Sequence, residues 1–255
     1  MKHKLAPLLF LLACAASAPA QSKKFQARSM QAARGGNGAL ATGSNYSEEA
    51  GMRVFLHGGN AVDAGVAALF AAAVAEFSNV GMGGETPILI RTKTGKVYAI
   101  AGVGPMPRLA TAKFFMEHRS RSGEILTIDP GGLKRIIPVA GILPALVPGT
   151  VGAGLVALLD FGTKSLSEEI EPAIELADGM AIDKDRSDAI ERSRDFFKLW
   201  PDSKRTFLPS HRVPLPGEIF HQPNLARTLR SMATAEKKAL ASGASRAAAI
   251  DAVAD

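Results

Sequence analysis

The stretch that decides the fold is Gly58-Gly59-Asn60-Ala61-Val62-Asp63-Ala64, together with the alanine-rich run that continues to Phe77. Asn60 is a favourable N-cap residue. The carboxylate of Asp63, three positions later, can reach back to the Asn60 N–H in a variant of the capping box. Small and apolar side chains then recur with helical spacing. The pattern predicts a helix from Ala61 to Phe77 that packs closely against a sheet or another helix.

A glycine cluster and a predicted hairpin follow this helix. Gly81-Met82-Gly83-Gly84 is expected to form a loop. Ile88–Arg91 and Val97–Ile100 contain strand-forming residues, and Thr92–Lys96 between them is typical of a turn. Upstream, the sequence predicts a helix from Ser47 to His57 with acidic residues in its first turn. Helices, glycine loop and hairpin together predict a layered α/β domain.

Further helices are predicted in the rest of the chain. They are expected near Ala112–His118 and over Thr150–Phe161, Leu166–Ala177, Ser187–Leu199 and Asn224–Asp255. A helix tolerates Pro172 only in its first turn or at a junction. The proline-rich segment Pro201–Pro223 is expected to be an irregular connection. Glu168 and Glu169 are expected on a solvated helix face, because basic residues lie near them.

Residues 1–20 have the pattern of an export signal. Lys2 and Lys4 precede an apolar run, and Ala18-Pro19-Ala20 has the small-x-small form that a signal peptidase cleaves. A lipoprotein signal is the alternative, because Leu11-Leu12-Ala13-Cys14 is close to a lipobox; Cys14 would then be acylated and attach the protein to a membrane. Either reading predicts a periplasmic or secreted protein. Residues 21–42 are expected to be a linker leading into a domain at 43–255.

Composition limits the classes of function. With 47% hydrophobic and 21% charged residues among 255, the chain can form a globular protein with a sizeable core. The excess of basic residues falls from six to four once Lys2 and Lys4 are removed. The charges are scattered and aromatic residues are few, so no nucleic-acid partner is expected. A single cysteine, Cys14, excludes an intramolecular disulfide, a zinc ribbon and an iron–sulfur site in this chain.

The common motifs of catalytic and binding sites are absent or incomplete. The glycine cluster follows a helix and precedes a strand, which is the reverse of a phosphate-binding loop. Thr94-Gly95-Lys96-Val97 lacks the hydroxyl residue that a Walker loop needs after its lysine. The four histidines beyond the signal show no close metal-ligand spacing, and no G-x-S-x-G elbow occurs. No cofactor or metal is therefore expected, although a zinc site built from distant residues stays open.

Seven segments, taken in order, resemble the γ-glutamyltransferase (glutathione hydrolase) family of N-terminal nucleophile hydrolases. They are Gly58–Ala64, Gly81–Gly84 (family G-I-G-G-G-G), Thr94–Ala99 (T-G-K-V-Y-A), Val147–Val151 (V-P-G-T-V), Glu171–Ala177 (E-P-A-I-x-L-A), Pro216–Glu218 (P-G-D) and Gln222–Leu229 (Q-P-D-L-A-R-T-L). Each segment alone is weak, but seven in family order with similar spacing are specific. The resemblance implies an α/β fold, as an incomplete four-layer α-β-β-α sandwich.

The resemblance also implies amide-bond hydrolysis or acyl transfer. Family members are precursors that cut themselves into a large and a small subunit. The new N-terminal Thr of the small subunit is the nucleophile, and its own amine is the base. This chain resembles the large subunit, truncated before the small one, so no catalytic residue is assigned in it. We expect it to be inactive alone and to need a small subunit and a small amide substrate, glutathione-like or another acyl amide.

Two departures from the family concern the acyl group. The family's R-E-x-A-P arginine pairs with the α-carboxylate of a γ-glutamyl group, a contact that suits a guanidinium. Val103-Gly104-Pro105-Met106-Pro107 stands in its place, and Glu85-Thr86-Pro87 replaces the last glycines. Val103 cannot bind a carboxylate, and Arg108 lies beyond Pro107. These changes suit acylase-like members of the family.

The candidate substrate-binding residues are Gly83, Gly84, Glu85, Val103, Gly104 and Arg108. The same stretches are also typical of turns that pack against a sheet. Two further classes of function stay open. One is a non-catalytic exported binding protein derived from the family. The other is a binder of nucleic acid or anionic membranes, which predicts strongly salt-dependent binding.

Overall fold

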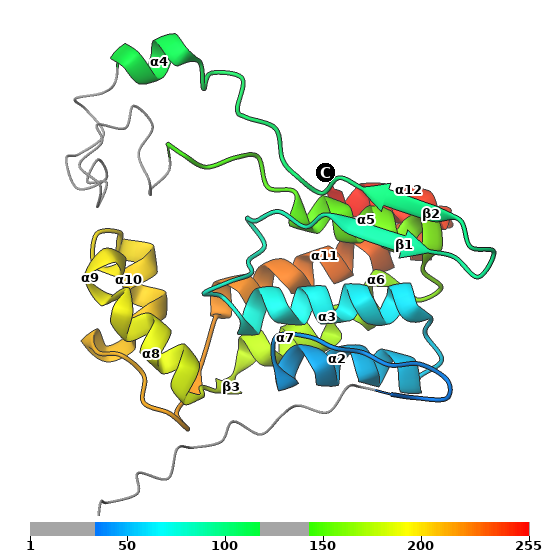
Figure 1. Cartoon of the computed structure of the whole chain (residues 1–255), viewed down its shortest axis with the longest axis horizontal. Coiled ribbons are helices and arrows are strands. Elements are labelled where there is room, and N and C mark those ends of the chain that lie inside the picture. Colours follow the sequence, from blue (N-terminus) through cyan, green and yellow to red (C-terminus); the bar gives the residue numbers. More distant parts are fainter. Residues whose placement is uncertain (1–33, 118–142, 255) are drawn as a thin grey trace, which may run out of the picture. The chain divides into compact units, whose positions relative to one another are not determined.

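The structure, a computed structural model, describes residues 34–117 and 143–254 (Figure 1). The expected export signal at 1–20, Cys14, most of the expected linker and His118 lie outside these residues. The elements are α2 (Asn45–Leu56), α3 (Ala61–Ala75), β1 (Ile88–Arg91), β2 (Val97–Ile100), α4 (Ala112–Glu117), α5 (Thr150–Phe161), α6 (Leu166–Glu169), α7 (Glu171–Asp178), β3 (Met180–Ala181), α8 (Lys184–Arg192), α9 (Arg194–Phe197), α10 (Pro201–Phe207), η2 (Pro209–His211), β4 (Ile219–Phe220), α11 (Pro223–Ala241) and α12 (Arg246–Ala254).

Helix α3 is the centre of the helical packing and contacts α2, α5, α6 and α7 (Figure 1). The predicted capping box at its start is confirmed: the Asn60 side chain accepts from the Val62 N–H, and Asp63 accepts from the Asn60 N–H at 2.7 Å. A Cβ at Gly51 of α2 would lie 2.7 Å from the Ala64 carbonyl oxygen. Gly51 of α2 and the small residues of α3 therefore let the two helices pack closely, as the alanine-rich sequence of α3 predicts.

The main core lies between α3 and the later helices. Its largest buried side chains are Phe70, Val74, Leu158, Leu166, Ile170 and Leu229, which come from α3, α5, α6, the α6–α7 junction and α11. A second cluster holds Met180, Ile190 and Phe220 beside the β3–β4 pair and α8. Burial of these side chains is the main stabilising contribution to the fold.

The predicted hairpin is confirmed with both strands at the predicted residues. β1 pairs antiparallel with β2, with Ile88 opposite Ile100 and Arg91 opposite Val97. The face that carries Ile88 and Ile100 packs on the core. The opposite face carries Leu89 and Val97, which are 77% and 59% exposed. Within the described residues each strand pairs only with the other, so the hairpin has free edges and an apolar outer face.

This open hairpin predicts self-association of the 255-residue chain. Free strand edges and exposed apolar side chains favour pairing with a second copy. We expect sedimentation velocity at rising concentration to show oligomers, and Leu89→Lys to reduce them because a charge on the outer face opposes packing. A chain that stays monomeric at all concentrations and unfolds in one sharp transition would contradict this expectation.

Several helix boundaries differ from the sequence prediction. Helix α2 starts at Asn45 rather than Ser47, because Ser44 is the N-cap and accepts from the Ser47 N–H. The helix expected at 166–177 is two helices, α6 and α7, that meet at Ile170, and Pro172 lies in the first turn of α7 as its chemistry requires. The helix expected at 187–199 is likewise divided into α8 and α9, and the one at 224–255 into α11 and α12.

Two sequence predictions were wrong. The segment Pro201–Pro223 contains α10, with Pro201 in the first turn, and strand β4. β4 pairs with β3, and each has two residues, which is too short for a periodic pattern. Glu169 is fully buried rather than solvated, because α6 turns it toward α3 and away from its exposed neighbour Glu168.

Candidate functional site

Three segments that are distant in the sequence meet through their main chains. We call this place the glycine junction and define it as residues 84–86, 102–105 and 147–150. The Gly84 carbonyl accepts hydrogen bonds from the Gly149 N–H at 3.0 Å and the Thr150 N–H at 3.1 Å. The Thr86 N–H donates to the Gly102 carbonyl at 2.8 Å. The junction therefore joins the loop before β1, the end of β2 and the start of α5.

Glycine allows the backbones of the junction to approach one another. A Cβ at Gly104 would lie 1.4 Å from the Val147 carbonyl oxygen, and one at Gly149 would lie 2.3 Å from the Gly102 carbonyl oxygen. Both distances are far inside van der Waals contact, so no side chain fits at either position. The shape of the junction is set by main-chain atoms.

Five of the six predicted substrate-binding residues lie at the junction. Gly84, Glu85, Val103 and Gly104 are inside it, with Glu85 and Val103 exposed, and the exposed Gly83 flanks it. The Val103 side chain is 50% exposed. Arg108 lies beyond it in an exposed turn, in which the Ala110 N–H donates to the Pro107 carbonyl at 2.8 Å. No hydrogen bond in the described part of the chain ties Arg108 to the junction.

The hydroxyl groups of the junction belong to Thr86 and Thr150. Their Oγ1 atoms are 3.0 Å apart and bond to each other, and Thr150 is buried. Among the described residues, no histidine or amine is bonded to either hydroxyl, whereas an attacking hydroxyl needs such a base. The described residues supply no nucleophile–base pair at the junction.

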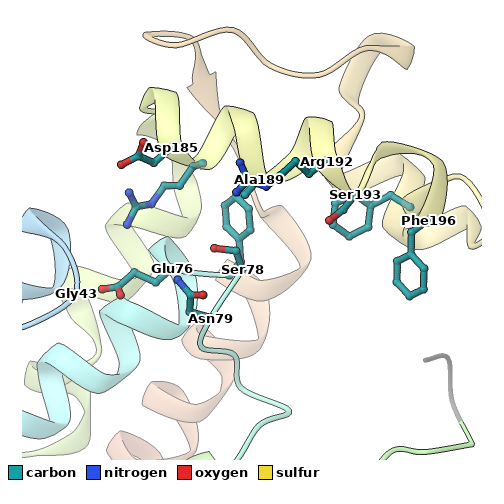
Figure 2. A pocket seen from close by; sticks show the side chains of 12 residues that line it. Gly43, Glu76, Ser78, Asn79, Asp185, Ala189, Arg192, Ser193 and Phe196 are labelled. Atoms are coloured by element: carbon teal, nitrogen blue, oxygen red, sulfur yellow. The ribbon is translucent and has the colours of Figure 1, made fainter. Parts of the chain in front are cut away.

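A polar cavity of about 540 Å³ lies beside the segment that leaves α3, and we call it the Glu76 pocket. Figure 2 shows Glu76, Ser78 and Asn79 on one side, with Asp185, Ala189, Arg192 and Ser193 of α8 and its end across from them. Phe77, Phe196 and Phe197 add aromatic walls. The volume is in the range of small-molecule sites. None of the six predicted residues lines this pocket.

Glu76 is held rigidly at the end of α3. It is buried, and its Oε1 accepts from the hydroxyls of Ser44 at 2.8 Å and Ser47 at 2.6 Å. Its backbone carbonyl accepts from the N–H groups of Asn79 and Val80, which fixes the turn into the glycine cluster. Glu76 thereby connects α2 to the loop that enters the junction.

Arg186 closes the other side of the pocket. Its guanidinium donates to the Ala75 carbonyl and to Asp183, and it lies over the Tyr46 ring at 5.3 Å. Sequence reasoning did not identify this pocket, because residues 76–79 and 185–197 come together only in the tertiary structure. Ser78 and Ser193 line it without a histidine among the lining residues, so it contains no nucleophile–base pair of that kind.

The described residues contain neither a metal-binding cluster nor a membrane-spanning helix. No cluster of three or more His, Cys, Asp or Glu side chains is arranged to bind a metal ion. No helix among residues 34–117 and 143–254 has the length and apolar character needed to cross a bilayer.

Comparison with known proteins gives a consistent result. A family model described as Gamma-glutamyltranspeptidase matches residues 47–252. The chain is 31% identical over 196 residues to a "Glutathione hydrolase proenzyme" of Pseudomonas sp. (strain A14), a match that covers 76% of this chain and 32% of the relative. It is also 31% identical over 215 residues to an "Acylase ACY 1 proenzyme" of Pseudomonas sp. (strain SE83), covering 83% of this chain and 37% of the relative. The chain thus spans about a third of the length of these relatives.

Solved structures agree with the sequence matches. The crystal structure of Helicobacter pylori gamma-glutamyltranspeptidase superposes with a TM-score of 0.69 at 30% identity, over 80% of this chain and 56% of that chain. A cephalosporin acylase from Bacillus halodurans superposes with a TM-score of 0.62 at 30% identity, over 74% of this chain and 34% of that one. Most of this chain therefore superposes on solved proteins of both kinds.

Proposed function

Because the chain belongs to the gamma-glutamyltranspeptidase family, and so has the α/β fold of N-terminal nucleophile hydrolases, we propose that it supplies the large-subunit portion of an exported amidohydrolase or acyltransferase. The observation that carries this proposal is the glycine junction. There the Gly81–Gly84 cluster and the Val147–Val151 segment, two of the family-like motifs, are joined by the Gly84 hydrogen bonds. The expected small-subunit Thr would attack the substrate carbonyl, with its own amine taking the proton.

The residues around the junction favour an acyl group without an α-carboxylate. Val103 offers no charge to such a group, and the negative charge of the exposed Glu85, the residue before Thr86, opposes the binding of a second carboxylate. The similarity to an acylase proenzyme as well as to glutathione hydrolases is consistent with this preference. The proposed substrate is therefore an acyl amide whose acyl chain is uncharged near the junction.

The 255-residue chain alone is expected to show no amidase activity, because none of its threonines matches the family nucleophile. Release of p-nitroaniline from γ-glutamyl-p-nitroanilide by this chain should equal the buffer blank. Activity is expected once the chain is co-produced with a Thr-containing small subunit, sought in the DNA following codon 255 or in a neighbouring gene. Turnover by the purified chain alone would contradict the proposal, and lack of turnover by the complete pair would favour a non-catalytic binding protein.

The specificity proposal is tested on the complete pair with two matched substrates. These are γ-glutamyl-p-nitroanilide and 4-aminobutyryl-p-nitroanilide, which lacks only the α-carboxylate. We expect kcat/KM to be higher for the second. Val103→Arg should raise the ratio of kcat/KM for the first over the second by about 10- to 100-fold, since a charge-assisted hydrogen bond contributes about 1.5–3 kcal/mol. An unchanged ratio would show that the acyl group does not bind beside Val103.

Export is part of the proposal and has its own test. The mass of the mature N-terminus in a bacterial host distinguishes cleavage before Gln21 from acylation at Cys14. A full-length chain that stays in the cytoplasm with residues 1–20 attached would contradict export.

A further inference from the structure

Three ionisable side chains from three helices meet inside the protein, apart from the glycine junction and the Glu76 pocket. Asp63 of α3 and Glu169 of α6 are both fully buried. Arg246, the first residue of α12, has a buried Nε. Its Nη2 donates to the Leu158 carbonyl near the end of α5 at 2.9 Å. Figure 1 shows α12 beside α5, which agrees with the contacts between these helices.

Both carboxylate oxygens of Asp63 accept hydrogen bonds. Its two oxygens accept from the Asn60 N–H (2.7 Å), the Thr163 N–H (2.6 Å), the Thr163 hydroxyl (2.6 Å) and the Lys164 N–H (3.2 Å). Burial raises the pKa of Asp63, but these donors outweigh burial and hold its pKa below the ordinary value. Asp63 is therefore an anion at neutral pH.

Glu169 has the opposite environment. Neither of its oxygens has a hydrogen-bond partner in the described part of the chain, and the Arg246 Nε has none there either. Burial, and next the neighbouring Asp63 carboxylate, raise the pKa of Glu169 to about 10, while Arg246 opposes the rise. The Glu169 carboxyl is therefore protonated at neutral pH, because a second buried carboxylate beside the Asp63 anion would have no hydrogen-bond donor among the described residues. The cluster then has one anion, one cation and no net charge.

Other charged groups near α6 are already paired. Glu168 is exposed, caps the start of α6 through Ser165 and lies 3.4 Å from Lys164 Nζ. Glu236 of α11 is buried and accepts from the Leu166 and Ser167 N–H groups. The Glu168 carboxylate also raises the pKa of Glu169, whereas the Arg246 cation lowers it.

We propose that Asp63, Glu169 and Arg246 form a proton-dependent latch that holds α12 against α5 and α11. With the Glu169 proton in place, the cluster is neutral and α12 stays docked. When alkaline solution removes that proton, the buried cluster carries an uncompensated negative charge. Hydration of that charge requires α12, the C-terminal element of the described chain, to move away.

The sign of the pH dependence follows from proton linkage. The folded protein binds the Glu169 proton more tightly than the unfolded chain, whose glutamate titrates near 4.5. The stabilising effect of this proton is complete below that pH and is lost as pH rises toward about 10. The unfolding equilibrium constant should therefore rise with pH, by up to about tenfold per unit for one linked proton.

The first experiment compares urea unfolding of the full chain from pH 6 to 9.5 with that of Glu169→Gln and Glu168→Gln. Glu169→Gln keeps the shape of the protonated carboxyl but cannot titrate. The rise of its unfolding equilibrium constant with pH should therefore be shallower than that of the wild type, by up to about one linked proton. Glu168→Gln removes an exposed neighbour on the same helix and should keep the wild-type slope. An unchanged slope in Glu169→Gln would overturn the proposal.

The second experiment locates the opening by hydrogen–deuterium exchange across the same pH range, with labelling times shortened to offset faster intrinsic exchange. Amides of α12 should lose protection before those of α3 in the wild type but not in Glu169→Gln. If the amides of all helices lose protection together, the proposed latch is wrong. If Glu169→Gln does not fold, carbon-13 NMR of glutamate-labelled wild type decides instead: one carboxyl should stay protonated at pH 8, and its absence would contradict the proposal.

Discussion

Replacing Gly102 by Ala is expected to lower the free energy of unfolding by about 2–4 kcal/mol, because the backbone cannot accept a side chain there. Gly102 has a φ of +54°, which favours glycine. A Cβ at this position would lie 1.9 Å from the Thr86 carbonyl oxygen and 3.0 Å from the Ala153 Cβ. The segments that carry Thr86 and Gly102 would have to separate, which breaks the hydrogen bond between them and displaces Val103.

A matched control separates this effect from glycine substitution in general. Gly152, in α5, has no atom within 4 Å of the place its Cβ would take. Gly152→Ala should stabilise the protein by about 0.5–1 kcal/mol, because alanine is the better helix former. Urea unfolding followed by circular dichroism measures both variants. Equal stabilities for the two would show that the junction is not tightly packed.

Asp63→Ala is expected to lower the free energy of unfolding by about 3–5 kcal/mol. The substitution leaves the N–H groups of Asn60, Thr163 and Lys164 without their acceptor. It also destabilises the connection between α5 and α6, because the Thr163 and Lys164 N–H groups donate to Asp63 there. Loss of the negative charge beside Glu169 offsets part of the cost. The net effect is large because one carboxylate fixes both the start of α3 and the segment 163–164.

The contribution of Asp63 to the free energy of unfolding should decrease in acid. Its folded pKa lies below its unfolded value of 3.8, so its contribution is present above that pH and is lost as pH falls through the folded pKa. The difference between wild type and Asp63→Ala should therefore narrow in acid. Asp160→Ala, at an exposed carboxylate of α5, is the control and should change stability by less than about 0.5 kcal/mol. A similar loss in both variants would contradict the role assigned to Asp63.

The elements that sequence predicts well are those with local causes. The α3 capping box depends on residues three positions apart, and the β1–β2 register depends on a short turn, so both are visible in the sequence. The division between α6 and α7 was suggested by Pro172 alone. The two-residue strands β3 and β4 exist because distant segments meet, and no local pattern marks them.

The site was predictable in part for the same reason. The glycine motif indicated Gly84, and the segment that stands in place of the family arginine indicated Gly104; the junction brings both together. The Glu76 pocket joins the end of α3 to α8 across about a hundred residues of sequence, and no spacing rule connects them. Glu169 was misread because an acidic pair beside basic residues has the pattern of a surface, whereas burial of its second member depends on how α6 lies on α3.

The glycine junction also bears on how relatives diverge. Its geometry comes from main-chain contacts at Gly84, Gly102, Gly104 and Gly149 and from the Thr86–Thr150 hydroxyl pair, whereas Val103 and Glu85 are exposed. Mutations at Val103 and Glu85 can therefore accumulate over evolutionary time at small thermodynamic cost. Substitutions at these two positions can therefore change the preferred acyl group while the backbone of the junction stays the same.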